Sequence, residues 1–204
     1  MKIHKRPPKK TERNKTALYM SILIIFIMVT SGFGVMFYGF SNPSSTVKYK
    51  DFKFKLTQQG YQTKINGNQY YFEALPQDVE DIPIEFGTKY TILNSQAVII
   101  TSDPDSAYKE ELALAHYNLN QMVLSLNKNV ANAFTKENEN LPVVTCMNSS
   151  LQFPVIEIVE SNVTEASMGD NGCVTVEFDS SFNLRRITSK IMYLILGVID
   201  ETPA

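Results

Sequence analysis

The chain has 204 residues, of which 44% are hydrophobic, and this is enough for one medium-sized domain with one accessory segment. A charged fraction of 20%, with nine Gly and nine Pro, excludes collagen-like and wholly disordered chains. The formal net charge is only -2, but the first 40 residues hold seven Lys or Arg and a single Glu. The rest of the chain is acidic, which argues against nucleic acid as a partner.

Residues 16–40 carry no charged side chain, and the run is long enough to cross about 30 Å of hydrocarbon as a helix. It is too long for the apolar core of a cleaved signal peptide, so we expect an uncleaved transmembrane signal anchor that contacts lipid. The basic residues within 1–15 lie just before it, and the positive-inside rule makes that segment a cytoplasmic tail. The sequence therefore predicts a single-pass cell-membrane protein whose residues from about 41 onward lie outside.

Cys146 and Cys173 are the two cysteines of the chain, and both follow the predicted anchor. An even number of cysteines in an oxidising compartment favours a disulfide between them. A catalytic or redox thiol is the alternative, but no Cys-x-x-Cys pair is present. Asn148 and Asn162 begin sequons for N-glycosylation in the same region.

After a linker over 41–47, we expect one extracytoplasmic domain over 48–204. Residues 48–56 alternate apolar and polar side chains, as in a half-exposed strand. The dipeptide Asn66-Gly67 predicts a hairpin between 61–65 and 69–72, which gives a meander of two or three strands. The acidic residues within 76–83 lack the spacing of an EF-hand loop, so a solvated turn is the better interpretation than a calcium site.

Residues 97–101 form an apolar, β-branched run typical of a buried strand. Asp103 and Pro104 then favour a helix that begins there and extends to about residue 127, with one apolar stripe along it. Residues 142–146 have the pattern of another buried strand, so the three segments predict a right-handed parallel crossover.

Two further strands are expected over 154–159 and 174–178, joined by a polar loop. A last helix begins near Ser180, with Arg185, Arg186 and Lys190 expected toward solvent. The resulting fold class is α/β (or α+β), with a mixed sheet of about five to seven strands covered by two helices.

Polar residues follow two of the expected strands, where ligands bind in open parallel sheets. They define a possible ligand crevice, made by Ser102, Asp103, Asp105, Thr145 and Asn148. Structural roles are the alternative, because helix capping and the disulfide would explain most of the polar residues and the cysteine in this region. His116 lies beside the apolar stripe, and we interpret it as a packed, hydrogen-bonded helix residue rather than a base.

Phosphate loops, dinucleotide fingerprints, zinc-protease helices and Gly-x-Ser-x-Gly elbows are missing from the sequence. We therefore expect no catalytic residues, no metal and no cofactor. The main hypothesis is a membrane-tethered extracytoplasmic interaction module or subunit of an envelope complex, with a protein partner and no catalysis of its own. The alternative is an extracytoplasmic hydrolase or small-ligand-binding domain that uses the crevice near 102–105 and 145–148.

Five short elements carry a resemblance to known proteins: Asn66-Gly67, residues 102–106, residues 141–146, Gly172-Cys173-Val174 and residues 194–198. In this set the chain resembles uncharacterised single-pass archaeal membrane proteins with an external α/β domain. The resemblance implies a topology and an archaeal cell surface. It implies no activity and assigns no functional residue.

Overall fold

The computed structural model describes residues 19–30, 46–138 and 141–200. The chain divides into two compact units, Met1–Pro43 and Ser44–Ala204. In the first unit, residues 19–30 are helical, whereas 16–18 and 31–40 of the expected anchor lie outside the described residues. Among the residues that are described, no helix combines the length and the apolar character needed to cross a membrane.

The second unit begins with a four-stranded antiparallel sheet in the order β1-β2-β3-β4. Its strands are β1 (Thr46–Tyr49), β2 (Phe52–Thr57), β3 (Gly60–Ile65) and β4 (Asn68–Phe72). Asn66 and Gly67 both have positive φ, 50° and 87°, which confirms the predicted hairpin turn. The single strand expected over 48–56 is instead a second hairpin, because Lys50 with φ 48° reverses the chain between β1 and β2.

A second sheet has five strands in the order β6-β5-β7-β9-β8. Its strands are β5 (Ala97–Ser102), β6 (Asn129–Phe134), β7 (Val155–Glu160), β8 (Glu165–Met168) and β9 (Val174–Phe178). The strands β6, β5, β7 and β9 run parallel to one another. The edge strand β8 is antiparallel to β9. The α/β class is confirmed, with two sheets in place of the one expected.

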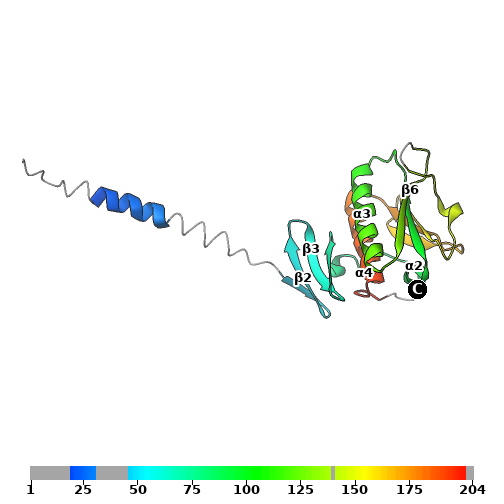
Figure 1. Cartoon of the computed structure of the whole chain (residues 1–204), viewed down its shortest axis with the longest axis horizontal. Coiled ribbons are helices and arrows are strands. Elements are labelled where there is room, and N and C mark those ends of the chain that lie inside the picture. Colours follow the sequence, from blue (N-terminus) through cyan, green and yellow to red (C-terminus); the bar gives the residue numbers. More distant parts are fainter. Residues whose placement is uncertain (1–18, 31–45, 139–140, 201–204) are drawn as a thin grey trace, which may run out of the picture. The chain divides into compact units, whose positions relative to one another are not determined.

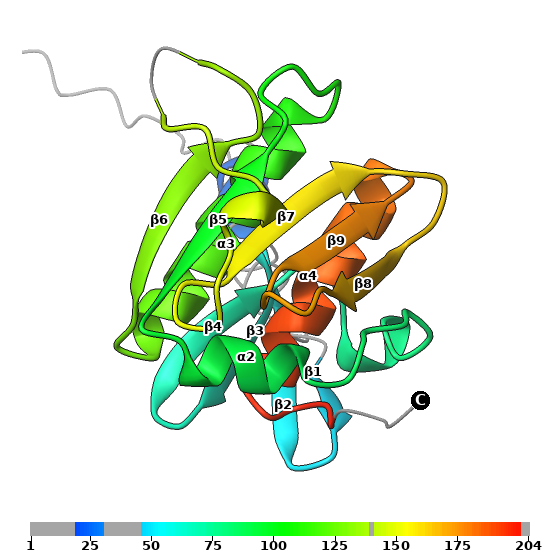
Figure 2. The same cartoon turned by 90° about the vertical axis from the view of Figure 1, so that its right-hand side faces the viewer.

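Three α-helices belong to this unit: α2 (Thr88–Asn94), α3 (Lys109–Ser125) and α4 (Ser181–Ile195). Two 3₁₀ turns, η1 (Pro76–Asp78) and η2 (Cys146–Asn148), lie in the connections. Figures 1 and 2 show α3 and α4 between the two sheets, with the first sheet on one side of these helices and the second sheet on the other. The expectation of two covering helices missed the short α2.

The parallel crossover exists, but its second strand was assigned to the wrong residues. After β5 and α3 the chain forms β6, which pairs in parallel with β5. Residues 142–146 contribute only an isolated bridge between Val143 and Phe134 before η2. The sequence of β6 was overlooked because its Asn and Ala residues have low strand propensity.

Helix α3 also starts later than predicted. Its first residue is Lys109, and no side chain caps it among the described residues. Asp103 instead accepts a hydrogen bond from the Asp105 amide at 2.9 Å, which closes a turn before the helix. In α4, by contrast, the predicted start is confirmed, because the Ser180 side chain accepts from the Asn183 amide.

The core is continuous from one sheet to the other through α4. Tyr193 stacks on Phe72 at a centroid distance of 4.1 Å and meets Phe54 edge-on at 5.7 Å. Lys190, expected toward solvent, is only 8% exposed and donates to the Glu80 carbonyl at 2.9 Å and to the Ile82 carbonyl. Its ammonium therefore holds the loop after η1 against the helix.

Candidate functional site

The five residues of the predicted crevice come from two segments, the end of β5 with the loop after it and the region of η2. Ser102 ends β5, and Asp103 and Asp105 follow it in the loop before α3. Thr145 is the N-cap of the short η2 turn and Asn148 is its last residue, and the two form a capping box. The Thr145 amide donates to Asn148 Oδ1 at 2.9 Å, so the polar groups of this pair serve the local backbone.

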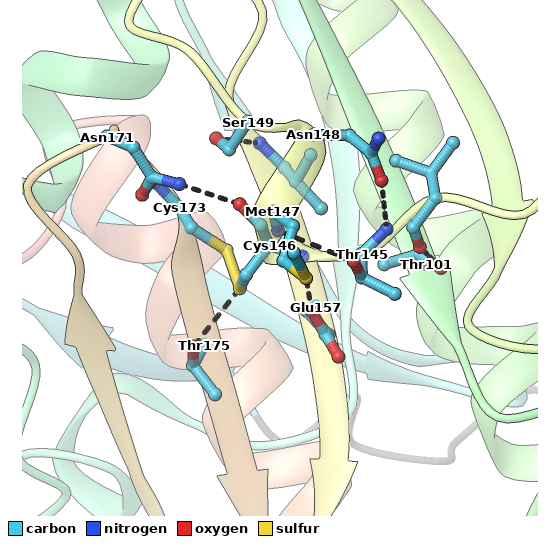
Figure 3. The surroundings of a disulfide bond; sticks show 12 residues. Thr101, Thr145, Cys146, Met147, Asn148, Ser149, Glu157, Asn171, Cys173 and Thr175 are labelled. Carbon is cyan, nitrogen blue, oxygen red and sulfur yellow. Dashed lines mark hydrogen bonds between the residues drawn. A yellow bond between two sulfur atoms is a disulfide. The ribbon is translucent and has the colours of Figure 1, made fainter.

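The disulfide predicted from the sequence is present between Cys146 and Cys173, with their Cα atoms 5.3 Å apart (Figure 3). It joins η2 to the chain just before β9. Three neighbours hold Cys146: Glu157 accepts from its amide at 2.7 Å, Asn171 donates to its carbonyl at 2.6 Å, and Thr175 Oγ1 lies 3.5 Å from its sulfur. The bridge thus sits inside a network over β7 and β9, where Glu157 and Thr175 are paired with each other.

The same place holds a group of possible metal ligands, Cys146, Glu157 and Cys173, within the part of the chain that is described. Both sulfurs are joined to each other and cannot bind a metal as thiolates. The arrangement is therefore that of a structural bridge. The sequon residues Asn148 and Asn162 are both exposed.

A hollow of about 660 Å³ lies between the loop after β5, the first half of α3 and the end of β6. Its wall includes Ser102 and Asp103 from the predicted crevice. Asp105, Thr145 and Asn148 do not line it. The remaining wall is mainly apolar, and comprises, among others, Pro104, Leu112, Ala113, Tyr117, Phe134 and Leu141.

Four polar side chains in this wall form a connected row. His116 Nε2 lies 3.0 Å from Ser102 Oγ, and His116 Nδ1 lies 3.0 Å from Asn132 Oδ1. Asn120 Nδ2 donates to the same Asn132 oxygen at 3.1 Å. The expectation that His116 is packed and hydrogen-bonded is confirmed, and its partners come from the adjacent strands β5 and β6.

Burial and charge pairing set the protonation states around this hollow. Burial lowers the pKa of His116, because an imidazolium loses hydration there, and the hydrogen bond to Asn132 opposes this only in part. At the rim, Lys136 Nζ lies 2.6 Å from Asp103 Oδ2, and this hydrogen bond lowers the pKa of the Asp103 carboxyl. At neutral pH the hollow thus contains an uncharged imidazole and a paired carboxylate.

A larger groove of about 1060 Å³ runs between the first sheet and helices α3 and α4. One wall is the strand β4 with the turn before β3, and the opposite wall is the exposed side of α3. Amides and tyrosines dominate its lining, which includes Gln58, Gln59, Asn68, Gln69, Tyr71, Tyr117, Asn118, Gln121 and Asn127. Tyr117 is 59% exposed and lies on the boundary of both the groove and the hollow.

Charged groups in the groove offset each other. Arg185 Nε lies 3.8 Å from Glu73 Oε1 at one side of the groove. Partial burial raises the pKa of Glu73, although Arg185 opposes that shift. Leu114 and Leu124 of α3 are exposed on the opposite wall, so the groove is neutral, amide-rich and partly apolar.

No protein-family model, curated protein or solved structure matches the chain. The hollow and the groove are therefore the candidate functional sites. Sequence reasoning found Ser102, Asp103 and His116 but missed Asn120, Asn132 and the whole groove. Recognition of β6 as a strand would have placed Asn132 beside Ser102, whereas no local signal in the sequence indicates the groove.

Proposed function

We propose that this protein is a membrane-tethered extracytoplasmic binding module, and that the groove between β4 and α3 binds an extended segment of a protein partner in the cell envelope. The observation that carries the proposal is that an edge strand forms one wall of the groove. Among the described strands β4 pairs only with β3, so its other edge faces away from the sheet. Residues 68–71 of β4 line the groove along that edge.

The chemistry of the lining fits a peptide. An edge strand presents backbone donors and acceptors at the spacing of an added strand. Amide side chains such as Asn118 and Gln121 offer one acceptor and two donors each, which match the peptide groups of an extended segment. Exposed Leu114 and Leu124 supply apolar contacts for its side chains. Because the charges of the groove offset each other, a neutral polar segment is the favoured occupant.

The membrane tether belongs to the proposal and rests on the sequence. The uncharged run over 16–40 and the basic residues before it support a signal anchor with a cytoplasmic amino terminus. The disulfide supports an oxidising location for the folded unit. The resemblance to single-pass archaeal membrane proteins agrees with the same topology.

The test is site-specific photocrosslinking of the full-length chain in its native membrane. The photoreactive residue benzoylphenylalanine replaces Leu124 on the groove wall. In a matched variant it replaces Phe86, which is 61% exposed and does not line the groove. We expect a discrete protein adduct from position 124 and none from position 86, with the adduct identified by mass spectrometry.

Two results would reject a peptide as the occupant of the groove, and a third would reject the proposed topology. Equal adducts from both positions would show non-specific contact. An adduct of position 124 to a glycan or lipid would assign the groove to another ligand class. Labelling of the chain's amino terminus by a membrane-impermeant reagent on intact cells would overturn the topology.

A further inference from the structure

We infer that the hollow beside α3 is an acyl-transfer site in which Ser102 is the nucleophile, His116 the general base and Asn132 the residue that orients the base. This goes beyond binding and departs from the expectation of a non-catalytic domain. The three side chains are linked in the order that nucleophilic catalysis requires, with a hydroxyl on one imidazole nitrogen and an orienting oxygen on the other.

The hydrogen bonds of Asn132 define the tautomer of His116. The amide oxygen of Asn132 already accepts from Asn120 Nδ2 at 3.1 Å, so the atom that faces His116 Nδ1 at 3.0 Å is an acceptor. With this amide orientation His116 Nδ1 carries the proton, and Nε2 directs its lone pair toward Ser102 Oγ at 3.0 Å. The same orientation leaves the buried Oδ1 of Asn120 without a hydrogen-bond partner among the described residues. An asparagine that presented its NH₂ group would enforce the opposite tautomer and remove the base.

The fold places the nucleophile where open parallel sheets bind ligands. Ser102 is the last residue of β5, an interior strand between β6 and β7, and it lines the hollow although it is only 3% exposed. Burial favours the uncharged imidazole, which is the form that accepts a proton. Lys109 and Glu110 open α3 on the same wall, and no side chain among the described residues caps this helix start. The charges of Lys109 and Glu110 offset each other, so the positive end of the helix dipole is what this turn offers to a developing oxyanion.

The expected reaction is ester hydrolysis in two balanced steps. In the first, Ser102 Oγ bonds to the ester carbonyl carbon and its proton passes to His116 Nε2. The bond to the alkoxy oxygen then breaks, and the alcohol leaves with the proton from Nε2. In the second, a water molecule attacks the acyl group and gives one proton to Nε2. The acyl bond to Oγ then breaks, Oγ recovers the proton, and the carboxylic acid is released.

The wall of the hollow indicates the class of substrate. Leu112, Phe134 and Leu141 make it mainly apolar, and about 660 Å³ accommodates a short or medium acyl chain. The favoured substrate is thus an ester with an apolar acyl group. Asn132 orients the imidazole without adding the negative charge of a carboxylate, so the imidazolium is less stabilised and slow turnover is expected.

The experiment uses the full-length, detergent-solubilised protein with an alkyl fluorophosphonate, which modifies activated serines, and with p-nitrophenyl butyrate. We expect a phosphonyl adduct mapped to Ser102 by mass spectrometry and slow release of p-nitrophenol. Ser102→Ala should abolish both, and His116→Gln should slow both by about 100-fold or more. The matched variant Ser161→Ala changes a serine outside the hollow and should behave as the unchanged chain.

A purely structural hydrogen-bonded row predicts a different outcome. The folded, unchanged chain would then show no adduct at Ser102, or p-nitrophenol release would persist in Ser102→Ala, and either result overturns the inference. Circular dichroism melts establish that each variant is folded. Should Ser102→Ala fail to fold, the adduct mapped on the unchanged chain decides the question. The crosslinking result at Leu124 is independent, because Leu124 lines the groove and not the hollow.

Discussion

Tyr193 of α4 stacks on Phe72 of β4 and also donates its hydroxyl to the Ala74 carbonyl at 2.7 Å. One fully buried side chain thus joins the last helix to the first sheet by ring contact and by hydrogen bond. The groove depends on this junction, because β4 forms one of its walls and Met192 of α4 also lines it.

Removal of the Tyr193 hydroxyl alone should show how much its hydrogen bond to the Ala74 carbonyl contributes to stability. Tyr193→Phe keeps the ring but leaves the Ala74 carbonyl without this donor, so we expect a loss of about 1–3 kcal/mol in the free energy of unfolding. Urea denaturation followed by circular dichroism is the measurement. Tyr90→Phe removes a hydroxyl from a ring that is 71% exposed and should be neutral. Equal effects of the two variants would contradict the assigned role.

The disulfide should contribute strongly to stability. Cys146 and Cys173 are separated by 27 positions, and a closed loop of that size lowers the entropy of the unfolded chain by an amount worth about 3–4 kcal/mol. Guanidinium denaturation with and without dithiothreitol should show this difference in the unchanged chain. The double variant Cys146→Ala with Cys173→Ala serves as control and should be insensitive to the reductant. A reductant effect of the same size in that variant would disprove the assignment.

Acidification should destabilise the fold through His116. Its pKa is lowered in the folded state, so below the ordinary value of about 6.5 the unfolded chain binds more protons than the folded one. This part of the stability is complete above about pH 6.5 and is lost as the pH falls toward the depressed pKa. Thermal melts between pH 7.5 and 5 should show the loss.

His116→Gln removes this titration, so the stability of the variant should depend less steeply on pH than that of the unchanged chain. Glu73, whose pKa is raised by burial, acts with the opposite sign in both chains, so the difference between their profiles isolates His116. An NMR titration of the imidazole should give a midpoint below 6.5. A midpoint above that value would contradict the prediction.

Lys190 should be a structural cation. Lys190→Met keeps a long apolar side chain but leaves the carbonyls of Glu80 and Ile82 without the ammonium that now donates to both. We expect about 1–3 kcal/mol of destabilisation in chemical denaturation. Lys55→Met, at an exposed position of β2, should change stability by less than about 0.5 kcal/mol. If Lys190→Met left the free energy of unfolding unchanged, water would be replacing the ammonium as the donor to these carbonyls, and the prediction would be wrong.

Regular patterns in the sequence predicted the elements with strong local signals. The Asn66-Gly67 turn, the buried run of β5, the apolar stripe of α3 and the Ser180 cap were each recognisable within a few residues. The second half of the crossover was not. Asn129–Phe134 becomes a strand because β5 offers a parallel partner and α3 covers it, and this tertiary effect outweighs its composition.

The candidate site was only half predictable for the same reason. Ser102 and Asp103 follow a clear strand, and the rule for strand ends located them correctly at the hollow. Thr145 and Asn148 were grouped with them because residues 142–146 were assigned to the neighbouring strand. Lys190 was placed toward solvent from helical periodicity alone, whereas the carbonyls that bind it lie more than 100 positions earlier in the chain.

The place of α4 in the chain has a consequence for biogenesis. Both sheets share this helix, yet it follows all their strands in chain order. If the residues after the proposed anchor are translocated in chain order, β1 to β4 emerge without the helix that completes their apolar face. Stable folding of the first sheet must therefore wait until almost the whole unit has been translocated. During that interval the unpaired edge of β4 can pair with a strand of another chain. When many copies are translocated at the same time, aggregation through this edge should therefore increase.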